Sequence, residues 1–155
     1  MSNTAGAAPA RAELGHAVTL MVRDRCLCLH VQRAARALAR RFDEAFRPFD
    51  LTNGQFSLMM SLNRPEPPTL GSVASLLAMD RTTLTAALKP LERRGLVKVA
   101  VDKEDRRSRR LSLTNKGRAL LTRAVPVWTA THAEVDREIA PHSPDALRGA
   151  LRSLA

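Results

Sequence analysis

The sequence contains no tyrosine, and aromatic residues make up only 3% of its 155 positions. Strands favour aromatic and β-branched residues, so this scarcity, beside abundant alanine, leucine and arginine, predicts a mainly helical fold. The two cysteines, Cys26 and Cys28, lie two positions apart, which excludes a disulfide framework and favours the cytoplasm. Long apolar runs are also missing. Residues 17–22 (AVTLMV) are too short to cross a bilayer, so we expect no membrane association.

Acidic residues are in the minority, with 15 Asp and Glu against 25 Lys and Arg and a formal net charge of +10. Basic chains bind polyanions because Lys and Arg release the counterions condensed on phosphates. Nucleic acid is therefore the expected partner, and an anionic membrane surface, the alternative, is disfavoured because the sequence has no long apolar run. The 45% of hydrophobic residues is enough for the core of about one domain.

Helical periodicity dominates both ends of the chain. Residues 1–15 are small and polar without periodicity, which predicts a disordered tail. After it, apolar residues recur every three or four positions and predict a long amphipathic helix that ends near Pro48. They are Leu27, Val31, Ala34, Leu38, Phe42, Ala45 and Phe49.

The C-terminal third repeats this pattern. Thr114 is a candidate N-cap for a long helix that Pro126 is expected to bend, and Ser143 with Pro144 opens a last helix. A single chain of this length has little with which to cover apolar helices at both ends. Residues 16–50 and 115–155 are therefore predicted to be dimerisation helices.

The central region, residues 51–114, contains a helix-turn-helix pattern. After a helix capped by Thr52, two short helical patterns over residues 70–77 and 81–94 are joined through Asp80. The Asp80 side chain can cap the second of these helices by accepting from the backbone N–H of Thr82 or Thr83. Gly95 is expected to end that helix.

Two alternating segments, residues 96–101 and 110–113, follow and are predicted to be strands. Between them, residues 102–109 (DKEDRRSR) form a charged hairpin tip without a core-forming residue. A β-hairpin directly behind a helix-turn-helix makes a winged helix. Residues 80–110 contain ten Lys and Arg against five Asp and Glu, so half of the net charge lies in a fifth of the chain. This concentration indicates nucleic-acid contact.

Residues 91–117 (LERRGLVKVAVDKEDRRSRRLSLTNKG) resemble the wing and flanking segments of the MarR family of winged-helix transcription regulators. The resemblance extends from about Cys26 to Leu154. It implies that Arg107 enters a minor groove while Asp105 braces its guanidinium, and that Arg106 and Arg109 hold phosphates. An always-charged guanidinium suits this role because narrow minor grooves concentrate negative potential.

The start of the second helix of the helix-turn-helix offers major-groove contacts. Its arginine and hydroxyl side chains suit base edges, thymine methyl groups and phosphates: Arg81, Thr82, Thr83 and Thr85. For Thr82 and Thr83, a structural role in the first turn is the alternative. Lys89, two turns further on, is expected at a phosphate, and Pro90 predicts a kink.

These features predict a dimeric repressor that binds double-stranded DNA at a palindromic operator. An architectural protein that coats DNA evenly, or an RNA-binding protein, is the alternative. An enzyme is not expected, because no nucleophile, base and orienting group can be named together. No cofactor is predicted either.

The family resemblance also implies an effector pocket between the dimerisation helices and the winged-helix lobe, for a small aromatic compound. The candidate lining residues are Phe42, Phe56, Met59, Met60 and Trp128. Aromatic and Met residues at helical spacing usually belong to a core, so this structural role is the alternative for most of them.

The segment CLCLH, residues 26–30, raises the question of a thiol sensor. On a helix, Cys26 and His30 lie roughly 40° apart and Cys28 points to the opposite side, which excludes a metal site with these three ligands. The family resemblance implies one candidate, because Cys28 lies at the position of the reactive cysteine in the organic-hydroperoxide branch of the family. That branch activates its thiol with tyrosine hydroxyls, and this sequence contains no tyrosine. Cys26 shares its face with His30 and Arg33, whose charge favours a thiolate. A structural role for both thiols, with Cys28 buried, stays open.

Overall fold

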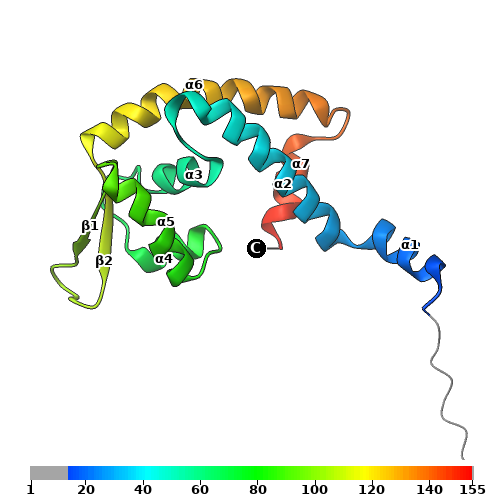
Figure 1. The fold of residues 1–155 in the computed structure, drawn as a ribbon, viewed down its shortest axis with the longest axis horizontal. Coiled ribbons are helices and arrows are strands. Elements are labelled where there is room, and N and C mark those ends of the chain that lie inside the picture. The colour runs from blue at the N-terminus through cyan, green and yellow to red at the C-terminus, as the bar shows by residue number, and fades with distance from the viewer. Residues whose placement is uncertain (1–13, 155) are drawn as a thin grey trace, which may run out of the picture. The chain divides into compact units, whose positions relative to one another are not determined.

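The computed structural model describes residues 14–154, and Figure 1 shows its helices and strands. The mainly helical fold with a two-stranded antiparallel hairpin is confirmed. The predicted tail, residues 1–15, lies outside the described residues except for Leu14 and Gly15. In chain order the elements are α1 His16–Arg25, α2 Leu27–Phe46, the 3-10 helix η1 Arg47–Phe49, α3 Asn53–Ser61, α4 Leu70–Leu76, α5 Arg81–Arg93, β1 Val97–Val101, β2 Arg109–Leu113, α6 Asn115–Glu138 and α7 Pro144–Arg152.

Helices α3 to α7 begin at capping side chains. Thr52 Oγ1 accepts from Gln55 N at 3.2 Å, and Gln55 Oε1 accepts from Thr52 N at 3.1 Å, which is a capping box. Such a side chain pairs a backbone N–H that the helix itself leaves without a partner. The predicted caps are confirmed, and Thr69 adds one that was not predicted. The caps are Thr52, Thr69, Asp80, Thr114 and Ser143.

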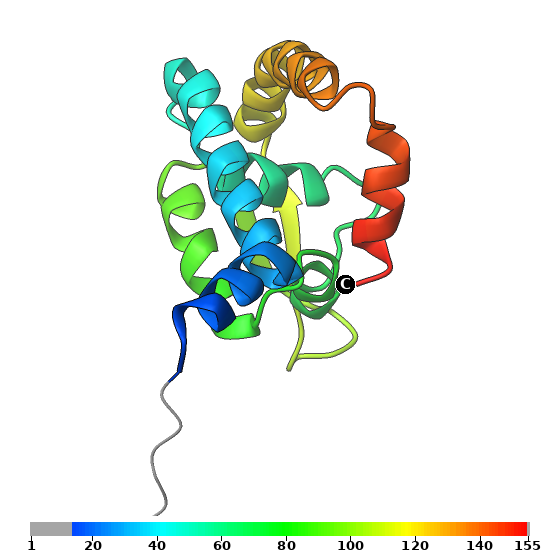
Figure 2. The ribbon, with the colours of Figure 1, turned by 90° about the vertical axis from the view of Figure 1, so that its right-hand side faces the viewer.

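The hairpin follows α5 after a single tight turn. Gly95 has a φ of 68°, a left-handed conformation that glycine adopts without strain. The strands pair from Val97 with Leu113 to Val101 with Arg109, within one residue of the predicted bounds. Figure 2 shows the chain passing from β2 directly into α6, while the hairpin tip points away from α6.

Helix α6 starts in close contact with the base of the hairpin. Thr114 N donates to Leu96 O at 3.1 Å, and the buried Gly117 lies over the same carbonyl. A Cβ at Gly117 would be only 2.1 Å from Leu96 O. Glycine is therefore required for α6 to approach the hairpin this closely.

The hydrophobic core lies among α2, α3, α4, α5, the hairpin and α6. Each fully buried large apolar side chain contributes roughly 1.5–3 kcal/mol to stability. The largest fully buried side chains are Phe46, Leu58, Met59, Leu62, Val73, Leu84, Leu88, Leu91, Leu96 and Leu111. This core gives α5 and the hairpin a fixed base.

The N-terminal helical region is interrupted at Cys26, which lies outside α2, so the helical geometry assumed for Cys26 relative to Cys28 and His30 does not apply, whereas residues 27–30 are helical as predicted. Cys26 has extended backbone angles (φ −74°, ψ 98°), and its Sγ accepts from Leu29 N at 3.4 Å. The thiol thus takes an N–H at the start of α2, as a capping side chain does. The chain divides into two compact units between Ala37 and Leu38. Within residues 14–154, we find no helix whose length and hydropathy would allow it to span a membrane.

Candidate nucleic-acid interface

The first turn of α5 is fixed by Asp80. Asp80 Oδ1 accepts from Thr83 N at 2.8 Å, and Thr83 Oγ1 donates to Asp80 Oδ2 at 2.5 Å. The hydrogen bond from the Thr83 hydroxyl, followed by those from backbone N–H groups, lowers the pKa of Asp80 below its ordinary value. Thr83 therefore has the structural role considered for it, because its hydroxyl proton is engaged by Asp80.

The remaining predicted contacts of α5 lie on its exposed face. Arg81, Thr85 and Lys89 recur every four residues and, like Thr82, are exposed. Thr85 Oγ1 donates to the carbonyl of Arg81 at 2.7 Å, so its oxygen remains an acceptor. A methyl group at Gly71 would lie 3.3 Å from Arg81 Nη2, so Arg81 extends over the start of α4. The leucines of α5 are buried on the other face, which leaves a polar surface of the kind that DNA contacts require.

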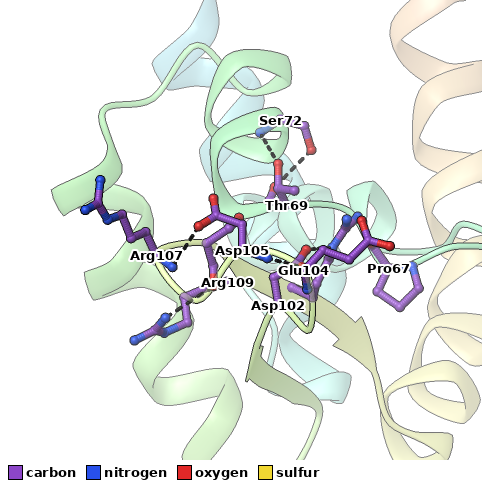
Figure 3. Close-up of polar contacts among 10 residues, drawn as sticks. Pro67, Thr69, Ser72, Asp102, Glu104, Asp105, Arg107 and Arg109 are labelled. Atoms are coloured by element: carbon purple, nitrogen blue, oxygen red, sulfur yellow. Dashed lines mark hydrogen bonds and ion pairs between the residues drawn. The ribbon is translucent and has the colours of Figure 1, made fainter.

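The hairpin tip presents exposed arginines on an ordered backbone. Asp105 Oδ1 accepts from Arg107 N at 2.9 Å, and the Arg107 side chain extends away from the tip (Figure 3). The family resemblance led us to expect Asp105 at the guanidinium of Arg107, whereas here it contacts the backbone. Arg109 Nη1 donates to the carbonyls of Arg106 and Ser108 at 3.1 and 3.2 Å. Arg109 thus helps to close the tip, while Arg106 and Arg107 stay fully available to a partner.

Asp102 was predicted to belong to a charged hairpin tip without a core-forming residue, but its side chain is buried. Its relative exposure is 7%, and its carboxylate pairs with Arg110 Nε. Its Oδ1 also accepts from Glu104 N at 2.8 Å and from Asp105 N at 3.3 Å. The hydrogen bond from Glu104 N, followed by that from Arg110, lowers the pKa of Asp102. In the sequence, the pairing could have been suspected only from the opposite charges of Asp102 and Arg110 on the two sides of one hairpin.

Arg110 connects the hairpin to the segment before α4. Arg110 Nη1 donates to Pro67 O at 3.1 Å, and the next residue, Leu111, donates its N–H to Pro68 O at 2.9 Å. Thr69 and Arg110 form an isolated antiparallel bridge. The wing is therefore attached to the helix-turn-helix along the side of β2.

The residues predicted to line an effector pocket are divided between core and surface. Phe42, Phe56 and Met59 are at most 4% exposed and belong to the core, as the alternative had it. Met60 and Trp128 are exposed, at 36% and 38%. The five residues therefore do not together form the wall of one open site in this structure.

Trp128 nevertheless belongs to an aromatic cluster that includes His132, a residue not predicted. Ring centroids are 4.4 Å apart for Trp128 and His132, 4.8 Å for Phe42 and His132, and 6.4 Å for Phe56 and Trp128. Burial lowers the pKa of His132, opposed by the nearby Asp136 carboxylate. An i, i+4 spacing from Trp128 was the signal that could have identified His132.

The two thiols lie on either side of the start of α2. Cys26 is half-buried, with its Sγ on the N–H of Leu29. Cys28 is exposed, which contradicts the alternative in which it is buried, and its Sγ accepts from Gln32 Nε2 at 3.1 Å. His30 Nε2 lies 3.3 Å from the carbonyl of Asp24. Among residues 14–154, no three His, Cys, Asp or Glu side chains are grouped as a metal site would require.

Comparison with known proteins bears on this interface. The MarR family model matches residues 51–108, which comprise the helix-turn-helix and most of the wing. The structure is similar to the transcriptional regulator MosR of M. tuberculosis in complex with DNA, with a TM-score of 0.76 and 38% identity over 84% of this chain and 93% of that one. It is also similar to the transcriptional repressor CouR bound to a 23-mer DNA duplex, with a TM-score of 0.74 and 29% identity over 94% of this chain and 99% of that one.

The relatives found by sequence comparison are transcriptional regulators, as the structural neighbours are. The HTH-type transcriptional regulator TtmR of Methylorubrum extorquens is 36% identical over 97 residues, 63% of this chain. The chain matches 50% of the length of TtmR. The organic hydroperoxide resistance transcriptional regulator of Bacillus subtilis is 29% identical over 101 residues, 65% of this chain and 69% of that protein.

Proposed function

Because this chain belongs to the MarR family of DNA-binding transcription regulators, we propose that it is a cytoplasmic, dimeric repressor of a palindromic operator. As a member of that family it is a regulator and not an enzyme. The observation that carries the proposal is the wing, in which exposed Arg106 and Arg107 stand on a hydrogen-bonded tip attached to the helix-turn-helix. The DNA-bound states named for MosR and CouR, and the name repressor for CouR, support it.

In the proposed complex, the exposed face of α5 enters a major groove and the wing reaches the adjacent minor groove. Arg81, Thr82 and Thr85 contact base edges or phosphates, and Lys89 contacts a phosphate. Arg107 enters the minor groove, where its fixed charge meets concentrated negative potential. The protein then represses by occupying the promoter.

Exposed apolar side chains on the terminal helices support a homodimer. Helix α7 exposes Leu147 and Leu151, and α1 exposes Val18, Met21 and Val22. Apolar side chains gathered on one helix are usually covered by a partner. A two-fold dimer would present two copies of α5, which explains why the operator is expected to be palindromic.

Two release mechanisms are proposed. A small aromatic ligand would stack on the exposed Trp128 and on the half-buried His132 beside it in the aromatic cluster. Oxidation of the exposed Cys28 or of Cys26 is the second mechanism, and the name of the B. subtilis relative supports it. Either event would act by changing the separation of the two DNA-binding lobes.

DNase footprinting and mobility-shift assays on the DNA upstream of the protein's own gene test this function. A repressor protects one discrete inverted repeat, whereas an architectural protein protects all of the fragment evenly and loses binding to competitor DNA. Repeating the shift with reductant, peroxide and a panel of aromatic acids separates the release mechanisms. If the Cys26→Ser, Cys28→Ser double variant still loses DNA on oxidation, thiol sensing is refuted.

A further inference from the structure

We propose that Asp102 is a positioning residue for DNA binding, which acts with Arg110 to hold the hairpin tip so that Arg107 faces the DNA. The inference rests on the wing contact proposed above. It concerns a buried carboxylate at the end of β1 that the DNA-contacting side chains do not include.

The burial of Asp102 requires an explanation, because a carboxylate seldom leaves water without partners. Its two oxygens are occupied by Arg110 Nε on one side and by the N–H groups of Glu104 and Asp105 on the other. Its own N–H donates to Ser108 O at 3.1 Å, across the tip. One side chain therefore joins the incoming strand, the turn and the outgoing strand.

From Asp102 a chain of contacts leads to Arg107. Asp105 N is bound by Asp102, and Asp105 Oδ1 in turn accepts from Arg107 N at 2.9 Å (Figure 3). Ser108 N donates to Asp105 O at 2.9 Å and closes the turn behind Arg107. The carboxylates of Asp102 and Asp105 thus fix the backbone from which the Arg107 side chain projects.

Arg110 fixes the other end of this chain of contacts. It holds Asp102 with Nε and Pro67 O with Nη1, while its backbone bridges to Thr69, the N-cap of α4. The tip is therefore oriented relative to the helix-turn-helix and not only within the hairpin. Preorganisation of this kind lowers the entropy lost when Arg107 is fixed on DNA.

An effect of charge alone and a positioning role predict opposite changes in DNA affinity when Asp102 is removed. Asp102 is an acidic residue next to the phosphates of the proposed complex, so its removal should strengthen binding if only its charge matters. If Asp102 positions Arg107, its removal should weaken binding. The sign of the effect separates the two explanations.

The test measures the Kd for a fluorescent duplex carrying the footprinted sequence, with the full chain and the variants Asp102→Ala, Glu104→Ala, Arg107→Ala and Asp102→Ala with Arg107→Ala. Glu104→Ala is the matched control, because it removes one negative charge from the same tip, and no hydrogen bond involving its side chain occurs among the described residues. We expect Asp102→Ala and Arg107→Ala each to weaken binding roughly tenfold, as for one lost arginine contact, and Glu104→Ala not to weaken it. In the Arg107→Ala background, Asp102→Ala should cost less than about twofold, because residues that act through one another are not additive.

Three results would overturn the inference. They are unchanged or tighter binding by Asp102→Ala, an equal cost of Asp102→Ala with and without Arg107, and a loss in Glu104→Ala as large as in Asp102→Ala. Unchanged binding by Arg107→Ala would instead refute the proposed wing contact itself. If circular dichroism shows that Asp102→Ala is unfolded, Asp102→Asn, which removes the ion pair with Arg110 that anchors the tip, is judged by the same criteria.

Discussion

At the scale of single residues, Gly117 marks the closest approach between α6 and the hairpin. The atom that a Cβ would meet, Leu96 O, belongs to the backbone and cannot rotate away. The same carbonyl accepts hydrogen bonds from Thr114 N and Thr114 Oγ1. A larger residue at position 117 must therefore displace both the start of α6 and the base of the wing.

Gly117→Ala is expected to lower the free energy of unfolding by about 2 kcal/mol or more, because it overfills a packed contact. Urea denaturation measures this. Gly149→Ala in α7 is the matched control, since the nearest atom to its Cβ would be Arg152 Nη2 at 3.8 Å. That variant should gain roughly 0.5–1 kcal/mol from the higher helix propensity of alanine. Equal stability of Gly117→Ala and the unchanged chain would contradict the close approach.

What could be predicted at this scale depends on how local the cause is. Thr52, Asp80 and Thr114 were identifiable as caps because each bonds an N–H three residues away. The burial of Asp102 was not, because it depends on Arg110, whose guanidinium also reaches Pro67 across 43 positions of sequence. The break at Cys26 was missed because apolar periodicity continues through it and no proline or glycine marks it.

At the scale of elements, α6 and the hairpin each contain a group whose pKa is lowered. For His132 the cause is burial, which disfavours the imidazolium. For Asp102 the causes are the hydrogen bonds from Glu104 N and Arg110, which favour the carboxylate. In both cases the unfolded chain binds more protons than the folded one, so stability increases with pH between the folded and unfolded pKa values.

We therefore expect the free energy of unfolding to fall on acidification in two steps. The first begins below about pH 6.5, where an unfolded histidine becomes protonated. The second begins below about pH 4 and includes Asp80, Asp102 and Asp136, because hydrogen bonds lower the pKa of each. Urea denaturation across this range assigns the first step with His132→Phe and measures the share of Asp102 in the second with Asp102→Asn. His132→Phe should remove the first step and keep the aromatic contacts. An unchanged first step in that variant would show that another group causes it.

The elements themselves were largely predictable, because periodicity, caps and Gly95 mark their ends. The strands were placed within one residue, and the helix-turn-helix follows from two leucine patterns joined at Asp80. The bridge between Thr69 and Arg110 was not predictable, since a single pair of residues in a loop has no periodic pattern. The candidate site was accordingly predicted as a set of exposed side chains, but without the contacts that hold the wing.

At the scale of the whole molecule, whose net charge is +10, the number of phosphates contacted by Lys and Arg determines how DNA binding depends on salt. Lys89→Ala should reduce the slope of log K against log salt by about 0.9, because one phosphate contact is lost, while sequence preference stays the same. Arg137→Ala, an exposed residue near the end of α6 remote from the hairpin, is the control and should leave the slope unchanged. Fluorescence anisotropy at several salt concentrations measures both. Equal slopes for all three proteins would exclude the Lys89 contact.

The proposed dimer leads to a second prediction for the whole molecule. Leu151→Glu should produce a monomer that keeps its helix content and binds the operator weakly, because Leu151 is exposed on α7 in the single chain. Analytical ultracentrifugation with circular dichroism distinguishes this from unfolding. Leu76→Glu, at an exposed leucine of α4, should remain a dimer. Dimers in both variants would place the interface elsewhere.

The backbone bonds at the base of the wing have a consequence for amide hydrogen exchange. Leu96 N donates to Leu91 O, Leu111 N to Pro68 O and Thr114 N to Leu96 O, so α5, β2, α6 and the segment before α4 are linked by their own amides. Groups linked in this way open cooperatively, and these three protons should exchange with deuterium at one common free energy. If α5 and the hairpin open only as one unit, they cannot change position on DNA independently of each other. Binding to operators with altered spacing between the half-sites would then depend on movement of the terminal helices.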